Sequence, residues 1–340
     1  MNTKTLVTVI TPVHNAAAYL PACIQSMRNQ SFQDFEHIII DDASTDNSWS
    51  IIADFAQKDA RIKAIKNPHK NSLSVVRNQA LELAQGKYIA KIDADDVSAP
   101  HRLQTQVDYL EQSPQIVLCG AGVQYFSEDQ DLSTWLLKVT SAEIKCQLLF
   151  SNCLANSTVM IRKAAIDQYH LRYQSDFDFS EDYGLWAALA QRGGVAIIPQ
   201  ILTNVRQHSQ KVSFKFTTTQ RENAQKVQAL LLQDLGISLT LEELQLHFDC
   251  VNTASSLELP KLQQLSNWLL KLQTCNYATQ IYPEPEFTQL LQQIWKKHTA
   301  GRTHLGPAFF KVMQQNRLSM YHTLSAYQKI KFRVKCWLRK

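Results

Sequence analysis

The sequence predicts an α/β protein in which a mainly parallel sheet is flanked by helices, followed by an α-helical C-terminal region. Three observations predict it. Short apolar runs alternate with amphipathic segments over the first 120 residues, polar clusters follow three of these runs, and the strand pattern fades after about residue 216. Alternation of strands and helices favours parallel pairing, because each helix carries the chain back across the sheet.

Four strands and four helices are expected in this N-terminal part. The strands are expected at 6–11, 35–41, 61–66 and 88–93, and the helices between and after them, the last two at 72–85 and 98–112. The first helix is indicated by apolar residues that recur on one face, Leu20, Ile24 and Met27. Asn15 is expected to cap this helix, Gly86 to end the third, and Ser98 to begin the fourth.

Polar clusters mark the ends of three predicted strands. TPVHN follows the first strand, DDASTD the second and DADD the fourth. Parallel sheets carry their ligand sites at the carboxyl ends of the strands, which lie along one edge. We therefore expect the three clusters to form one site.

The segment KYIAKIDADDVSAP places Asp93, Asp95 and Asp96 directly after a buried strand. A single acid would be enough to favour the N-terminus of the next helix. Carboxylates this close repel each other by ~1 kcal/mol at 4 Å in water, and several-fold more near a low-dielectric surface. Mg²⁺ or Mn²⁺ would relieve the repulsion, and such ions usually complete their shell with substrate phosphates. We expect a diphosphate-linked substrate.

Several other sites are excluded by the sequence. No G-x-G-x-x-G follows the first strand, and there is no G-x-x-x-x-G-K-[ST]. An EF-hand would need glycine at Ser98 and glutamate at Gln104. Two alternatives stay open: a metal-dependent phosphotransferase or phosphatase that uses DADD, and a binding module without turnover. Phosphotransferases of haloacid-dehalogenase type carry Asp-x-Asp on their first strand, which here ends in TPVHN.

The net charge of +5 is concentrated at the C-terminus. Residues 329–340 hold six Lys and Arg and no acid, so the other 328 residues sum to −1. This excludes a nucleic-acid-binding face spread over the main body. No apolar run is long enough to span a bilayer, and the N-terminus does not read as a signal peptide. Seven scattered cysteines without a CxxC pair indicate reduced thiols, and we expect a cytoplasmic location.

The ordered set VTVITPVHN, HIIIDDASTDNS, SLSVVRNQAL and GKYIAKIDADDVSAPHRL resembles the family 2 glycosyltransferases of GT-A fold, a Rossmann-like architecture. The resemblance extends more loosely through SEDYGLW and VRQHSQKVS. It implies a glycosyltransferase domain at 1–215, with a nucleotide-sugar half at about 1–120 and an acceptor half at about 121–215. A helical accessory domain is expected at 216–340.

The resemblance also implies an activity. The expected enzyme is a metal-dependent, inverting hexosyl- or N-acetylhexosaminyltransferase. Its donor would be a nucleotide-diphosphate sugar, with UDP expected as the nucleotide. The acceptor would be a hydroxyl of a glycan or of a lipid-linked saccharide, in bacterial surface polysaccharide or lipopolysaccharide assembly.

Roles for individual residues follow from the same resemblance. Nucleotide contacts fall on Thr11, Pro12, Asn15, Asp42 and Arg77. Asp93 would approach the ribose and the metal, Asp95 would ligate the cation, and Asp96 would touch the donor sugar. His14 replaces the usual aromatic residue of TPxYN, and Asn156 stands where the family segment often has histidine.

Local alternatives exist for two of these residues. Asp42 suits an Asx-type turn acceptor in DDASTD, and Arg77 suits a solvated helix position. Similarly, His208 in the late segment NVRQHSQKVS is expected as a further metal ligand, as a phosphate contact or as a solvated loop residue.

A second acidic site opens another predicted helix, where Glu181 and Asp182 follow Ser180 as the candidate N-cap. Acids are favoured in the first turn of any helix. By the resemblance, Asp182 supplies the general base and Glu181 supports it or binds the acceptor. The chemistry needs such a group, because an acceptor hydroxyl is a poor nucleophile until a base removes its proton.

Residues 327–340 form a basic amphipathic segment. One helical stripe collects its large apolar residues, Tyr327, Ile330, Val334, Trp337 and Leu338. The same residues also alternate well enough for a strand, and a solvated terminal helix is a further alternative. As a helix the segment would attach to an anionic inner-leaflet surface, at up to ~1 kcal/mol per basic residue. Removing residues 327–340 is expected to shift the protein from the membrane to the soluble fraction without abolishing donor hydrolysis.

Overall fold

The computed structural model describes four segments, 5–127, 130–208, 217–252 and 258–338. The chain forms two compact units. The first contains Met1–Ile144 and Asn152–Ala224, and the second contains Lys145–Ser151 and Gln225–Lys340. The predicted domain boundary between residues 215 and 216 lies outside the described residues.

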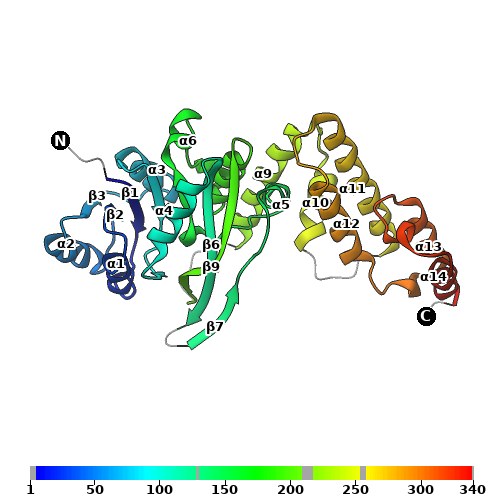
Figure 1. Ribbon diagram of the computed structural model, residues 1–340, viewed down its shortest axis with the longest axis horizontal. Coiled ribbons are helices and arrows are strands. Elements are labelled where there is room, and N and C mark those ends of the chain that lie inside the picture. The colour runs from blue at the N-terminus through cyan, green and yellow to red at the C-terminus, as the bar shows by residue number, and fades with distance from the viewer. Residues whose placement is uncertain (1–4, 128–129, 209–216, 253–257, 339–340) are drawn as a thin grey trace. The chain divides into compact units, whose positions relative to one another are not determined.

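The described part of the first unit is built on a nine-stranded sheet in the order β3-β2-β1-β4-β8-β6-β9-β5, with β7 paired to β6 (Figure 1). The strands are β1 (Val7–Val13), β2 (Phe35–Asp42), β3 (Ile62–Asn67), β4 (Tyr88–Lys91), β5 (Val97–Ser98), β6 (Ile116–Ser127), β7 (Gln130–Trp135), β8 (Met160–Arg162) and β9 (Gly194–Arg206). The first four strands in this order pair in parallel, and β6 pairs in parallel with β9. The short β8 joins the two groups by antiparallel pairing with β4 and β6.

Helices flank this sheet along the first unit. They are α1 (Leu20–Arg28), α2 (Ser48–Lys58), α3 (Leu73–Leu83), α4 (Arg102–Gln112), α5 (Ser141–Gln147, which ends in the second unit), α6 (Lys163–Gln168) and α7 (Glu181–Ala190). The four predicted strands and four predicted helices of the N-terminal part are all present. The expected mainly parallel sheet is therefore confirmed.

Apolar burial explains why these segments form. All eight residues of β2 are buried, as a strand covered on both faces requires. On α1 the predicted apolar face of Leu20, Ile24 and Met27 is fully buried. Each such side chain contributes roughly 1.5–3 kcal/mol by leaving water.

Two predicted helix starts are wrong. α1 begins at Leu20, and Asn15 instead adopts a φ of 52° while its side-chain oxygen accepts a hydrogen bond from the Thr45 N–H at 2.8 Å. α4 begins at Arg102, and Ser98 lies in β5. In both cases the polar residue serves the loop after a strand, which sequence spacing alone does not separate from a helix cap.

The predicted role of Gly86 is also wrong. α3 ends with Ala84 as its C-cap, and Gly86 lies beyond it beside β1. A Cβ atom on Gly86 would lie 2.5 Å from the backbone nitrogen of Thr8. The Gly86 N–H donates to the Thr8 hydroxyl at 2.8 Å. Glycine is needed here for the close approach of two backbones.

The second unit is helical in its described residues, as predicted for the C-terminal region. Its helices are α9 (Thr217–Asp234, which starts in the first unit), α10 (Leu241–Asn252), α11 (Leu259–Thr279), α12 (Glu286–Thr299), α13 (Gly306–Gln315) and α14 (Ala326–Leu338). The basic C-terminal segment is thus a helix and not a strand over its described residues, which end at Leu338. No helix among the described residues has the length and apolarity to cross a bilayer.

Candidate functional site

A cavity of about 1300 Å³ lies at the carboxyl ends of β1, β2 and β4. Pockets for small ligands typically measure roughly 300–1,000 Å³, so this cavity can hold a larger molecule. It is lined by most of the residues that the sequence singled out: Pro12, Asn15, Asp42, Arg77, Asp93, Asp95, Asp96, Glu181, Asp182 and His208. Thr11 lies behind this lining, buried, with its hydroxyl 2.9 Å from His37 Nε2.

Asp42 is fixed by the last residue of β3 and by the loop that follows it. Its carboxylate accepts hydrogen bonds from Asn67 Nδ2 at 3.0 Å, from the Asn71 N–H at 2.9 Å and from Asn71 Nδ2 at 2.8 Å. His14 packs beside it, with Nδ1 2.8 Å from the Asp42 carbonyl oxygen. The ends of β1 and β2 are therefore joined into one wall of the cavity.

The backbone is left-handed at two points of the cavity wall. Asn15 and Phe179 have φ values of 52° and 66°, in the left-handed region that side chains other than glycine rarely adopt. Phe179 is the more unusual of the two, because a bulky side chain adopts this conformation less readily than asparagine does.

The three acids of DADD have different surroundings. Asp93 accepts from Asn156 Nδ2 at 2.9 and 3.0 Å. Asp96 is buried, and its carboxylate accepts two hydrogen bonds, from the backbone N–H of Arg206 at 3.0 Å and from the Ser157 hydroxyl at 2.5 Å. Asp95 and Asp93 are both partly exposed and line the cavity, so these two acids of the loop are placed to meet a ligand.

Asp95 lies against His208. The carboxylate Oδ2 is 2.9 Å from His208 Nε2, and the imidazole packs on the ring of Tyr19 with centroids 4.5 Å apart. His208 Nδ1 is buried without a hydrogen-bond partner among the described residues. No set of three potential His, Cys, Asp or Glu ligands occurs in the described part of the chain. A carboxylate and an imidazole nonetheless fit an ion that completes its shell with substrate oxygens.

The second acidic site is tied to Arg77. The guanidinium is buried on α3, pairs with Glu181 and lies 3.0 Å from Asp182 Oδ1. Burial raises the pKa of Glu181 above its ordinary range, against the opposing effect of Arg77. Burial opposes the charge of Arg77, but Asp182, Glu181 and Asp93 raise its pKa above the ordinary value. Arg77 is therefore an internal counter-charge, not the solvated residue of the alternative.

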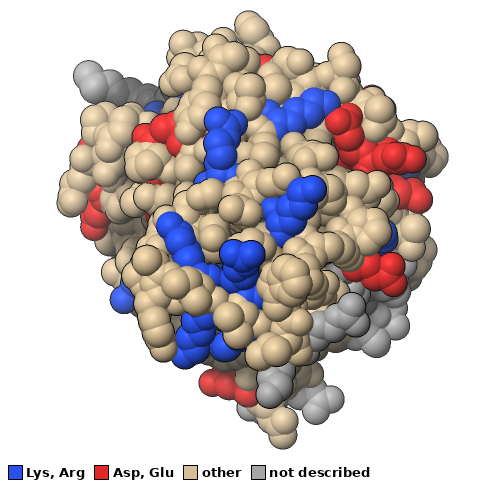
Figure 2. Space-filling model, turned by 90° about the vertical axis from the view of Figure 1, so that its right-hand side faces the viewer, with Lys and Arg blue, Asp and Glu red and all other residues tan. Residues whose placement is uncertain are grey.

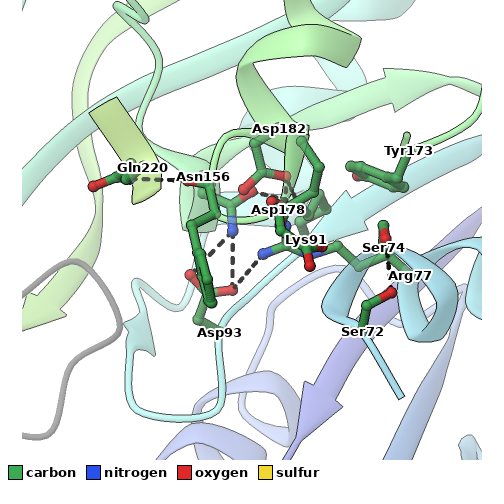
Figure 3. A network of polar contacts seen from close by, with 12 residues as sticks. Ser72, Ser74, Arg77, Lys91, Asp93, Asn156, Tyr173, Asp178, Asp182 and Gln220 are labelled. Carbon is green, nitrogen blue, oxygen red and sulfur yellow. Dashed lines mark hydrogen bonds and ion pairs between the residues drawn. The ribbon is translucent and has the colours of Figure 1, made fainter. Parts of the chain in front are cut away.

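Lys91 joins the two acidic sites. Its ammonium group donates to Asp182 Oδ1 at 2.5 Å and to Asn156 Oδ1, and Asn156 in turn donates to Asp93 (Figure 3). The Lys91 side chain is almost fully buried, and its Nζ lies 4.9 Å from the centre of the Tyr173 ring. Burial, reinforced by Arg77, lowers the pKa of Lys91 to about 8.

Lys91 was not predicted from the sequence, although a lysine inside the apolar strand YIAKI is a visible anomaly. Arg102 was not predicted either; it is fully buried and donates to the Lys91 carbonyl oxygen at 2.6 Å. Asp178 was missed as well. It lines the cavity, and its Oδ1 is buried without a hydrogen-bond partner among the described residues.

Comparison with known proteins identifies relatives. Residues 8–169 match the model of the family "Glycosyl transferase family 2". An uncharacterized glycosyltransferase of Haemophilus influenzae is 29% identical over 78% of this chain and 83% of its own. The putative teichuronic acid biosynthesis glycosyltransferase TuaG of Bacillus subtilis is 30% identical over 57% of this chain and 76% of its own. WfaP of Escherichia coli, named a UDP-Glc:α-D-GlcNAc-diphosphoundecaprenol β-1,3-glucosyltransferase, is 29% identical over 55% and 71%.

Solved structures share the fold. TarS 1-349 of S. aureus, in complex with UDP, aligns with a TM-score of 0.55 at 15% identity, over 92% of this chain and 88% of that one. The mannosyltransferase PcManGT of Pyrobaculum calidifontis, in complex with GDP-Man and Mn²⁺, aligns with a TM-score of 0.53 at 14% identity, over 93% and 88%.

Proposed function

Because this chain belongs to glycosyltransferase family 2 and has the GT-A fold, we propose that it is a metal-dependent, inverting enzyme that moves a sugar from a nucleotide-diphosphate donor to a hydroxyl. The family and the glycosyltransferase activity agree with the sequence analysis. One observation carries the finer proposal: the pair Asp95 and His208 and the pair Glu181 and Asp182 line the same cavity. One pair would serve the leaving group and the other the nucleophile.

The donor nucleotide would bind along the ends of β1 and β2. Asp42 and Asn15 line the cavity there, and Asp42 is held by hydrogen bonds from Asn67 and Asn71. A carboxylate held in place in this way can accept hydrogen bonds from the N–H groups of a base or the hydroxyls of a ribose. UDP in TarS and UDP-Glc in the name of WfaP support a UDP-sugar as donor.

Asp95 and His208, with Asp93 beside them, would hold a divalent cation. A carboxylate combined with an imidazole fits Mn²⁺ better than Mg²⁺, which prefers oxygen ligands alone. The Mn²⁺ in PcManGT supports this choice. When bound, the ion neutralises the charge that develops on the leaving diphosphate.

Asp182 would act as the general base. Lys91 and Arg77 both contact its Oδ1, so Oδ2 is the oxygen proposed to take the proton from the acceptor hydroxyl. The hydroxyl oxygen then forms a bond to the anomeric carbon as the bond to the diphosphate oxygen breaks on the opposite face. Direct displacement of this kind inverts the anomeric configuration.

The acceptor would be a lipid-linked saccharide at the cytoplasmic face of the inner membrane. The acceptor in the name of WfaP is a diphosphoundecaprenol-linked sugar, and TuaG is named for teichuronic acid biosynthesis. Asp178 and Glu181, which line the cavity near Asp182, are the groups we propose to hold acceptor hydroxyls.

A panel of nucleotide-sugars with Mn²⁺, scored for nucleoside diphosphate release with and without lipid-linked acceptor extracts, tests the proposal. Asp182→Asn is expected to lower kcat by roughly 10²–10⁴-fold while donor binding persists, because general-base catalysis contributes about that factor. Asp95→Asn is expected to raise the Mn²⁺ concentration needed for activity. Asp54→Asn, an exposed acid on α2, is the matched control.

Three results would contradict the proposed transfer reaction. Release from no donor, or equal rates for Asp182→Asn and Asp54→Asn, would contradict the proposed chemistry. Mass spectrometry that found a phosphorylated Asp93 or Asp95 during turnover would favour the phosphotransferase alternative instead.

A further inference from the structure

The C-terminal part of the chain is strongly basic. Residues 287–340 contain no Asp or Glu. They contain eleven Lys and Arg: Lys296, Lys297, Arg302, Lys311, Arg317, Lys329, Lys331, Arg333, Lys335, Arg339 and Lys340. The net charge of +11 over this stretch is far above that of the whole chain. It lies in one unit and not in the cavity described above.

We propose that α14 docks the second unit on the surface of an anionic lipid bilayer, lying along the surface with its apolar stripe among the lipid headgroups. The inference deepens the proposed function, since it names the surface where a lipid-linked acceptor would be met.

One side of α14 is already used for packing. Phe332 lies against Phe309, Phe310 and Tyr321, with ring centroids 6.0 to 6.2 Å apart. Cys336, one turn further on, is fully buried. These contacts hold the helix on α13 and fix which of its sides faces outward.

The opposite side is a row of large apolar side chains in contact with solvent. Between 48% and 73% of each is exposed, the five being Tyr327, Ile330, Val334, Trp337 and Leu338. At about 100° per residue, these positions cover an arc of roughly 100°, about half a turn from Phe332 and Cys336. The stripe is therefore not part of the core of its own unit.

Cationic side chains flank this stripe. By the same helical geometry, Lys331 and Lys335 lie along one border and Arg333 along the other, and all three are exposed. Lys329 lies nearer the packed side, 5.7 Å from the centre of the Tyr321 ring. Figure 2 shows Lys and Arg side chains gathered on the face at the C-terminal end, with Asp and Glu side chains toward the margins.

Charge selects the lipid surface over a second copy of the chain. Two copies joined through α14 would bring two stretches of +11 together, which is unfavourable. An anionic surface is complementary, attracts each nearby Lys or Arg, and accepts Trp and aliphatic side chains at headgroup level. Exposed aliphatic and aromatic residues between cations are the pattern of helices that lie in this interface.

The test uses the full chain and vesicle sedimentation, with phosphatidylglycerol–phosphatidylcholine vesicles compared with pure phosphatidylcholine at low and high salt. The wild type is expected to prefer the anionic vesicles and to lose that preference at high salt. The pair Lys331→Gln and Lys335→Gln is expected to weaken binding by about 25-fold at low salt, at roughly fivefold per basic residue. Lys58→Gln with Lys87→Gln, exposed lysines of the first unit, is the charge-matched control.

The apolar stripe is tested separately. Ile330→Asn with Trp337→Gln is expected to weaken binding at least about tenfold, whereas Leu241→Asn, an exposed leucine on α10, is not. Brominated lipids are expected to quench part of the wild-type tryptophan fluorescence, and less of it in Trp337→Phe. Point substitutions are preferred to removal of α14, which would expose Phe309 and Phe310.

Equal binding to neutral and anionic vesicles, or unchanged binding in both α14 variants, would overturn the proposal. So would a wild-type dimer that the α14 variants convert to a monomer without any binding to vesicles. Because none of these measurements needs turnover, the lipid surface and the proposed transfer reaction can fail independently.

Discussion

The ammonium group of Lys91 lies 2.5 Å from Oδ1 of Asp182, although the two residues are 91 positions apart in the sequence. Lys91 also donates to Asn156, which holds Asp93. Lys91 thus links the proposed base to the proposed donor site, alongside Arg77, which contacts both Asp182 and Asp93.

Substitution of Lys91 tests this role. Lys91→Met removes one of the two cationic donors that hold Asp182 but keeps the length of the side chain, and Arg77 alone then holds the carboxylate. We expect kcat to fall roughly 10²-fold, the size expected for about 1 Å of misplacement, with little change in donor KM. Steady-state kinetics with Lys87→Met, an exposed lysine paired with Glu111, as control makes the measurement. A loss confined to KM would contradict a positioning role.

The pair Asp95 and His208 predicts that Mn²⁺ binding weakens when either side chain is replaced. His208→Ala is expected to raise the Mn²⁺ concentration for half-saturation at least about tenfold, as loss of a supporting group typically does, and Asp95→Asn to raise it further. Calorimetric titration of Mn²⁺ in the presence of UDP measures this without turnover. His304→Ala, at an exposed position outside the cavity, serves as control. Unchanged Mn²⁺ binding in both variants would rule out these ligands.

Arg77 predicts a stability effect. Arg77→Met leaves Glu181 buried without its counter-charge, and removal of one partner of a buried pair costs about 3–5 kcal/mol. Urea unfolding followed by tryptophan fluorescence is expected to show this loss. Adding Glu181→Leu is expected to recover much of it, because the uncompensated carboxylate is gone. Failure of the second substitution to recover stability would assign the loss to packing instead.

His37 predicts a pH dependence of stability. Burial, with Arg61 acting in the same direction, lowers its pKa from 6.5 to about 3. The unfolded chain therefore binds the proton more readily, and the contribution of His37 to stability is present above pH 6.5 and lost as the pH falls toward 3. Between pH 7 and pH 5 the expected loss is about 2 kcal/mol.

His37→Gln keeps a polar partner for Thr11 and is expected to flatten this pH dependence, as measured by urea unfolding at a series of pH values. His101→Gln, at an exposed position, is expected to leave it unchanged. Equal slopes for wild type and His37→Gln would show that other groups govern the acid sensitivity.

Local pattern was enough to predict the N-terminal strands and helices, because burial there follows the periodicity of residues such as Leu20, Ile24 and Met27. It was not enough for helix ends: Asn15 and Ser98 have the right chemistry for caps, but tertiary contacts assign them to loop and strand. The residues of the cavity were largely predicted through the resemblance to a family. Lys91 was not, since its burial depends on Asp182 and Tyr173, which only the fold brings to it.

Residues 145–151 belong to the second unit, although both flanking segments belong to the first. Within that unit the Phe150 carbonyl accepts from Gln228 Nε2, and the Phe150 ring stacks on His247 with centroids 4.6 Å apart. A protein fragment that stopped at residue 224 would therefore keep a buried phenylalanine but lose the helices that cover it. The second unit is made of two stretches of the chain, Lys145–Ser151 and Gln225–Lys340. A chimera that exchanges this unit between relatives therefore has to exchange both stretches, because one cut in the chain cannot separate the two units.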